Sequence, residues 1–170
     1  MSRTPPPPAA NSKHTTRAAL ARRLSPSRRR GRKVVFTNGC FDLVHAGHVR
    51  YLERARKLGD LLVVGVNTDA SVRRLKGEGR PILPLRERIT LLGALAAVDY
   101  VVPFSEDTPA VLIRALAPDV LVKGADWKPG AIVGRREVLA KGGTVRRVSM
   151  QSNLSTSQII RRIRSQNSSR

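Results

Sequence analysis

Residues 37–52, TNGCFDLVHAGHVRYL, decide the fold because they join a short apolar run to a helical pattern. The apolar run is KVVFTN, residues 33–38, and it predicts a strand. Val49, Leu52 and Ala55 then recur at helical spacing. A strand that passes through a glycine-containing turn into a helix presents unpaired backbone N–H groups. Such a helix start favours an anionic ligand.

Apolar runs and helical patterns alternate along the rest of the chain. The expected strands are residues 60–67, 99–104, 118–124 and 144–149, and the expected helices are 84–96, 108–117, 131–141 and 155–164. Thr108 is expected to cap the second of these helices, with Pro109 next. This alternation predicts an α/β fold, a Rossmann-like three-layer sandwich with a mainly parallel sheet. The domain is expected to span residues 33–165, with a C-terminal tail at 166–170.

The N-terminal residues differ in composition from the rest. Residues 1–33 hold ten Lys or Arg and no Asp or Glu, so half of the formal net charge of +20 lies there. Four consecutive prolines at 5–8 exclude a helix, and apolar residues are too few to offset the entropy of ordering. Residues 1–32 are therefore predicted to be a disordered basic tail, with at most a weak helix around 16–24. An organelle transit peptide or a misplaced start codon would have the same composition.

The composition also excludes several classes of protein. No apolar run is long enough to cross a membrane, so no membrane partner is expected. Cys40 is the single cysteine, so no internal disulfide can form, and a reducing, cytoplasmic location is expected. One cysteine and three histidines do not make a convincing structural zinc site, and no protein metal ligand is assigned.

Polar residues gather at the ends of the predicted strands, where parallel-sheet proteins bind ligands. Three groups follow strands, at residues 37–48, 67–69 and 123–127. A fourth group of hydroxyl side chains, residues 155–157, opens the last helix. These four groups are expected to converge on one edge of the sheet.

His45 and His48 stand three residues apart and can point to the same side of the first helical turn. A neutral imidazole donates a hydrogen bond and a protonated one adds charge, so either form suits a phosphate. Gly47 would let a nucleotide approach the backbone, because it has no Cβ. Taken alone, the pattern is equally consistent with surface histidines that cap a helix.

The wider pattern points to a family. The stretch NGCFDLVHAGHV resembles the signature loop of the nucleotidyltransferase superfamily marked by His-x-Gly-His, and STSQIIRRI resembles its second signature. Both occur in the expected order, and the resemblance runs from residue 34 to 163. Within the superfamily, LKGEGRP, RERITLLGALAAVDYVV, EDTP and DVLVKGADW are most similar to the adenylyltransferases of bacterial ADP-heptose synthesis. The stand-alone form is expected, because no kinase-like segment is present.

This resemblance implies a reaction. The family transfers AMP from ATP to D-glycero-β-D-manno-heptose 1-phosphate, giving ADP-heptose and pyrophosphate for lipopolysaccharide core synthesis. ATP is expected as a substrate, with Mg²⁺ bound through its phosphates. The acceptor phosphate oxygen is already an anion, so neither a general base nor a nucleophilic side chain is required. Catalysis then consists of in-line positioning and stabilisation of developing charge.

The resemblance also assigns residue roles. His45, His48 and Lys76 are expected to be catalytic, stabilising charge on the α-phosphoryl group and the leaving pyrophosphate. For Asn67 and Asp69, helix caps and turns are the favoured interpretation. For Lys76 and Arg80 the alternative is a solvated basic loop. Nucleotide or phosphate contacts are expected from Thr37, Asn38, Gly39, Phe41, Gly47, Arg80, Arg88, Lys123, Gly124, Asp126, Ser155, Thr156 and Ser157.

Two other functions stay open. A cytidylyltransferase acting on glycerol 3-phosphate, or on a related phosphorylated alcohol, would share both signatures. The net charge would also suit a basic nucleic-acid-binding protein. However, aromatic residues are few and no recognised DNA- or RNA-binding motif occurs, so no specific nucleic acid is expected as a partner. The sequence leaves a homo-oligomer open.

Overall fold

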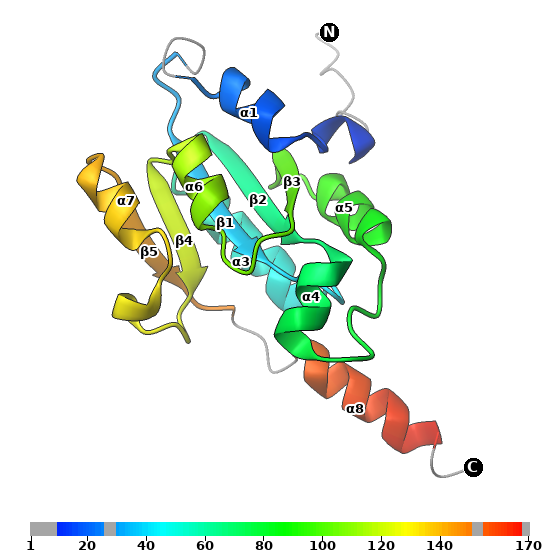
Figure 1. Ribbon diagram of the computed structural model, residues 1–170. Helices are drawn as coiled ribbons and strands as arrows, with labels where there is room; N and C mark the ends of the chain where they lie inside the picture. The colour runs from blue at the N-terminus through cyan, green and yellow to red at the C-terminus, as the bar shows by residue number, and fades with distance from the viewer. Residues whose placement is uncertain (1–9, 26–29, 151–154, 168–170) are drawn as a thin grey trace, which may run out of the picture.

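The computed structural model describes residues 10–25, 30–150 and 155–167. Its centre is a sheet in which the five strands lie in the order β3-β2-β1-β4-β5, and every pair is parallel (Figure 1). The strands are β1 (Val34–Gly39), β2 (Leu61–Asn67), β3 (Tyr100–Phe104), β4 (Val120–Gly124) and β5 (Thr144–Val148). The chain builds outward from β1 to β3 and then returns to the other side of β1. The topological switch point, where such folds bind ligands, therefore lies between β1 and β4.

Helices connect the strands and begin close to the expected residues. They are α1 (Arg17–Arg23), α3 (Ala46–Arg56), α4 (Asp69–Lys76), α5 (Leu85–Ala94), α6 (Ala110–Leu116), α7 (Arg135–Ala140) and α8 (Thr156–Asn167), with short 3₁₀ turns η1 (Ala10–Lys13) and η2 (Pro129–Ala131). Helix α4 was not expected, because its sequence is short and mostly polar. The predicted Thr108 cap is wrong, since Pro109 occupies the N-cap position without a side-chain hydrogen bond. Among the described helices, none is both long and apolar enough to cross a membrane.

Helices cover both faces of the sheet, which confirms the three-layer sandwich. Val34 and Phe36 of β1 pack with residues of α1, α6 and α7, whereas Val35 packs with residues of α3 and α5. The alternation follows from the two-residue period of a strand. Figure 1 shows α6 and α7 in front of the sheet and α3 behind it. All residues of β2 are buried, as expected for a parallel strand covered on both faces.

The prediction of a disordered tail over residues 1–32 is wrong for residues 10–25. Leu20 and Leu24 of this segment are 0% and 4% exposed and join the same apolar cluster as Val34. The backbone N–H of Thr15 donates to the carbonyl oxygen of Val101 in β3. Two leucines one helical turn apart provide the burial that the low average hydropathy of the segment concealed. Residues 1–9 and 26–29 lie outside the described residues.

This contact gives a testable prediction about stability. Changing Leu20 to alanine should lower the free energy of unfolding by about 2–5 kcal/mol, because it empties a fully buried site. Urea denaturation of the full chain measures the change, and Arg23→Ala, an exposed position on the same helix, serves as the control. Equal unfolding midpoints for the two variants would show that the segment contributes nothing to the fold.

Candidate active site

A pocket of about 600 Å³ opens where β1, β2 and β4 end. Its wall combines segments far apart in the sequence: the loop after β1, the end of α4, the end of β4 and the start of α8. The expected residues among those that line it are His45, His48, Lys76, Asn38, Gly39, Phe41, Arg80, Lys123, Gly124, Asp126, Ser155, Thr156 and Ser157. The imidazole pair and the hydroxyl cluster of the last helix therefore meet around one cavity.

The two histidines are held by the first turn of α3. His45 is the N-cap residue, and its Nδ1 accepts a hydrogen bond from the backbone N–H of Gly47 at 3.1 Å. The backbone N–H of His45 points back to Nδ1 of His48 at 3.4 Å. This reciprocal arrangement has the form of a capping box, with histidine in both side-chain positions. Because Nδ1 of each ring accepts, the proton of a neutral ring is on Nε2, which becomes the donor.

Electrostatics keeps these rings neutral. Burial, and as a second cause the neighbouring His45, together lower the pKa of His48 to about 4. Burial also lowers the pKa of His45. Within the described residues, Nε2 of His45 is buried and has no hydrogen-bond partner. A buried donor without a partner is costly, so an anionic oxygen in the pocket is the chemistry that this geometry suits.

Phe41 shapes the loop that precedes the histidines. Its φ of 48° lies in the left-handed region, which a bulky residue rarely adopts. The side chain is 6% exposed, and its ring lies 5.4 Å from the ring of His48. Gly39 faces the ring of Phe41, and a Cβ on Gly39 would lie 3.2 Å from that ring. Phe41 thus lines the pocket and also packs in the apolar core.

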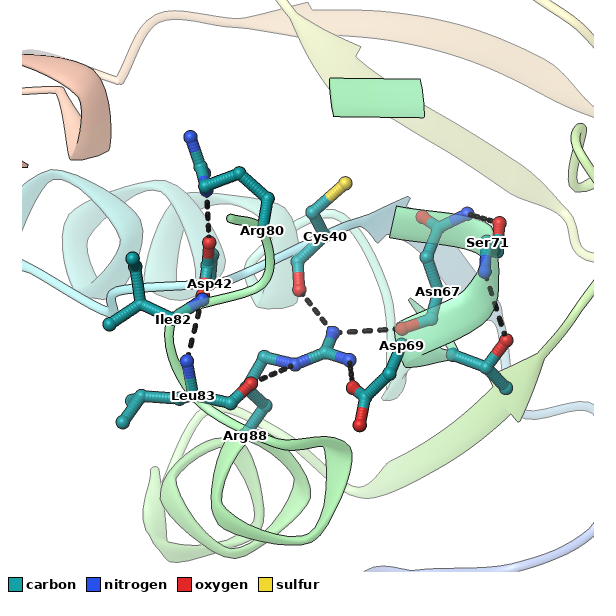
Figure 2. Close-up of polar contacts among 10 residues, drawn as sticks. Cys40, Asp42, Asn67, Asp69, Ser71, Arg80, Ile82, Leu83 and Arg88 are labelled. Atoms are coloured by element: carbon teal, nitrogen blue, oxygen red, sulfur yellow. Dashed lines mark hydrogen bonds and ion pairs between the residues drawn. The ribbon is translucent and has the colours of Figure 1, made fainter. Parts of the chain in front are cut away.

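Asp42 ties the segment after α4 to this loop. The carboxylate of Asp42 accepts hydrogen bonds from the backbone N–H groups of Ile82 and Leu83, at 2.6 Å and 3.0 Å, and pairs with Nε of Arg80 (Figure 2). Arg80 and Lys76 both line the pocket. A carboxylate with a guanidinium and two backbone donors is stable when buried. Asp42 therefore orders a cationic wall beside the histidines.

Arg88 differs from its expected role. The side chain is 0% exposed and lies outside the pocket lining, although a nucleotide or phosphate contact was expected. Its guanidinium donates to the carbonyl oxygens of Cys40, Asn67 and Leu83 and to the carboxylate of Asp69, as Figure 2 shows. These partners come from three separate connections of the fold: the loop after β1, the junction of β2 with α4, and the segment between α4 and α5. Arg88 therefore joins the loops behind the pocket and, with its donors directed to these groups, does not face a ligand.

Lys123 brings a cation to the opposite side of the pocket. Its side chain is 6% exposed, its Nζ donates to Oδ1 of Asn38 at 2.5 Å, and Nζ lies 5.2 Å from the centre of the Trp127 ring. Burial lowers the pKa of Lys123 to about 8, and the carboxylate of Asp126 partly opposes the shift. A bound phosphate would favour the charged form. A Cβ on Gly124 would lie 2.2 Å from Oδ1 of Asp126, so glycine is what allows Asp126 to fold over the strand end.

The start of α8 completes the wall. Ser155 and Gln158 exchange hydrogen bonds between side chain and backbone N–H, at 2.6 Å and 3.2 Å, which is again a capping box. The hydroxyl of Thr156 donates to the carbonyl oxygen of Leu43, in the loop before α3. A second helix N-terminus thus faces the same cavity as α3, and both favour negative charge.

Some expected residues lie behind the pocket, and some lining residues were missed. Thr37 is fully buried, and its hydroxyl is 2.7 Å from that of Tyr51. The backbone N–H of Gly47 donates to the capping side chain of His45, and neither Thr37 nor Gly47 lines the cavity. The loop after β3 was not expected at the site, and it contributes Asp107, Thr108 and Pro109. The rule that ligands bind beyond strand ends would have found this loop. Other lining residues that were not assigned are Cys40, Asp42, Tyr51, Asn67, Leu75, Trp127, Val133 and Met150.

The donor set of the pocket suits phosphate better than a protein-held metal. In the part of the chain that is described, no group of three or more His, Cys, Asp or Glu side chains could hold a metal ion. Imidazole, ammonium, guanidinium and hydroxyl donors instead surround the cavity.

Comparison with known proteins agrees with this geometry. The chain is 55% identical over 151 residues to the bifunctional protein HldE of Photorhabdus laumondii, an overlap of 89% of this chain and 32% of that protein. It is 58% identical over 147 residues to the bifunctional protein HldE of Aeromonas hydrophila, and the matched region covers 86% of this chain and 31% of that protein. The chain thus spans about a third of the length of these relatives.

A solved structure is similar over most of its own length. The crystal structure of the lipopolysaccharide core biosynthesis protein from Thermoplasma volcanium matches with a TM-score of 0.60 and 31% identity, over 70% of this chain and 98% of that one. The model of the cytidylyltransferase-like family matches residues 36–162, a range that includes both the histidine loop and the start of α8. The chain belongs to the cytidylyltransferase-like family.

Proposed function

We propose that the chain transfers AMP from ATP to D-glycero-β-D-manno-heptose 1-phosphate, giving ADP-heptose and pyrophosphate for lipopolysaccharide core synthesis. The observation that carries the proposal is the convergence of His45, His48, Lys76 and the hydroxyl cluster at 155–157 on one cavity. The similarity to the lipopolysaccharide core biosynthesis protein of Thermoplasma volcanium supports the assignment to lipopolysaccharide core synthesis. A reaction that consumes ATP fits a cytoplasmic location.

The chemistry follows from the charges. A phosphate oxygen of the acceptor attacks the α-phosphorus of ATP, and the bond from that phosphorus to the oxygen bridging to the β-phosphorus breaks. Pyrophosphate leaves with the electron pair. The Nε2–H groups of His45 and His48 hold the α-phosphoryl oxygens, while Lys76 and the start of α8 hold the leaving phosphates. These donors are fixed in place before charge develops, which is how such groups lower a barrier.

Mg²⁺ would arrive with the nucleotide and neutralise part of the phosphate charge. The residues described here would then act around the nucleotide and would not coordinate the ion directly. Their task is to position the acceptor oxygen in line with the bond that breaks.

The test is pyrophosphate release by the full chain. ATP or CTP is offered with heptose 1-phosphate or glycerol 3-phosphate, in all four combinations. We expect release with ATP and heptose 1-phosphate, and little with the other three. A clear preference for CTP would contradict the proposal and favour a cytidylyltransferase. Tight, sequence-selective DNA binding without pyrophosphate release would favour a nucleic-acid-binding protein.

A further inference from the structure

Asn67, the last residue of β2, is held so that one amide atom faces the pocket. The side chain is 3% exposed and lines the cavity. Its Nδ2 donates to the hydroxyl of Ser71 at 2.9 Å, and that hydroxyl donates to the carbonyl oxygen of Glu106 at 3.3 Å. In Figure 2 the amide nitrogen is turned toward Ser71, and the amide oxygen lies on the side of Cys40. Among the described residues, no hydrogen bond occupies that oxygen.

The backbone of Asn67 is fixed as firmly as its side chain. Nη1 of Arg88 donates to the carbonyl oxygen of Asn67 at 2.8 Å and to that of Cys40 at 2.6 Å. One buried guanidinium therefore links the chain just after β1 to the end of β2. The amide oxygen of Asn67 is consequently a preorganised acceptor at the wall of the pocket.

The interpretation favoured by the sequence, a helix cap or turn, does not account for this arrangement. Helix α4 is capped by Thr68, whose hydroxyl accepts from the backbone N–H of Ser71. The Asn67 side chain contacts a side-chain hydroxyl instead of a backbone N–H. A buried amide that α4 does not need as a cap calls for another role.

The two sides of the pocket differ in chemistry. Beyond β4 lies the ring of Trp127, and beyond β5 lies the apolar Met150; together they suit a flat base. Beyond β2 and β3 lie Asn67, Asp107 and Thr108, which offer amide, carboxylate and hydroxyl groups. Those groups suit a molecule with several hydroxyls. The histidines lie at the first turn of α3, which follows β1, the central strand of the sheet.

We propose that Oδ1 of Asn67 accepts a hydrogen bond from a hydroxyl group of the acceptor, and that Asn67 thereby helps to select a polyhydroxylated acceptor. This inference rests on the proposed function for the identity of the acceptor. Arg88 and Ser71 act through Asn67 as positioning residues. A site built to bind a hydroxyl rejects an analogue that lacks it, because its own acceptor would stay unpaired.

The test compares Michaelis constants in the full chain. Asn67→Leu should raise the KM for heptose 1-phosphate by about tenfold, the effect of losing one neutral hydrogen bond and leaving a hydroxyl unpaired. The KM for ATP should change by less than about twofold. Ser71→Ala keeps Oδ1 of Asn67 and removes only the hydroxyl that holds the amide in place. This variant should therefore raise the KM for heptose 1-phosphate by a smaller factor. Trp127→Leu should do the reverse of Asn67→Leu, raising the KM for ATP more than that for the acceptor.

A set of monodeoxy sugar 1-phosphates identifies the hydroxyl. The wild type should lose about tenfold in kcat/KM with one analogue of the set, whereas Asn67→Leu should use that analogue as well as the parent sugar. Asn67→Ser provides the same comparison if the leucine variant does not fold. Equal rises in both KM values, or no change in either, would overturn the role of Asn67.

This experiment keeps the two proposals separate. Pyrophosphate release by the wild type with heptose 1-phosphate tests the proposed function alone. If the wild type uses glycerol 3-phosphate instead, the proposed function fails. The ratio of KM values is then measured with that hydroxylated acceptor, and it still decides the role of Asn67.

Discussion

Replacing His48 with alanine should lower kcat by roughly two to three orders of magnitude, the cost of one preorganised donor at a site of developing charge. The reason is geometric: its Nδ1 accepts from the backbone of His45, so Nε2–H is directed away from that contact. The pKa of about 4 keeps the ring neutral near pH 7, so the variant removes a neutral donor and not a cation. Steady-state pyrophosphate release at saturating ATP and acceptor measures the change.

A second variant separates catalysis from helix capping. Glutamine is a common residue at the third helical position of a capping box, so His48→Gln should keep the first turn of α3 intact. The His48→Gln variant should nevertheless lose most of the activity, because the glutamine amide does not place a donor where Nε2 of the imidazole lies. His14→Ala is the matched control, since His14 is exposed and joins β3 only through a backbone bridge to Val101. Activity of His48→Gln close to that of the control would show that the imidazole only caps the helix.

The sheet could be predicted from the sequence because its strands are buried on both faces. A stretch such as LLVVGVN has no polar alternation, and its flanking helical patterns leave few other folds. The histidine loop could be found as well, because its chemistry is local. Two imidazoles and a helix start lie within four residues, 45–48, and fold together through hydrogen bonds within the same turn.

Features that depend on distant contacts were hidden. Arg88 is buried only because carbonyl groups of Cys40, Asn67 and Leu83 come together around it. In the sequence it stands on a polar part of a helix, where an arginine is normally exposed. Leu20 was misjudged for the same reason, since the cluster that covers it comes from strands and helices much later in the chain. Motifs reveal the residues that touch a ligand more readily than the residues that position them.

The second large effect is expected at Arg88. Arg88→Met should lower the free energy of unfolding by about 3–5 kcal/mol, because it leaves the carboxylate of Asp69 and several carbonyl groups without their buried partner. The loops at the ends of β1 and β2 should then separate, and kcat/KM should fall even where the variant is fully folded. Denaturation curves give the change in the free energy of unfolding. Pyrophosphate release, measured under conditions well below the midpoint of unfolding, gives the change in kcat/KM.

Arg88→Lys and Arg86→Met complete the test. Lysine keeps the charge but lacks the planar fork that reaches three loops at once, so it should restore only part of the stability. Arg86 lies on the same helix with a side chain that is 86% exposed and paired with Glu87, so its loss should change stability by less than about 0.5 kcal/mol. If Arg88→Met lowers the free energy of unfolding no more than Arg86→Met does, the loops hold their positions without the guanidinium of Arg88. The pocket would then owe its shape to Asp42 and the strand ends alone.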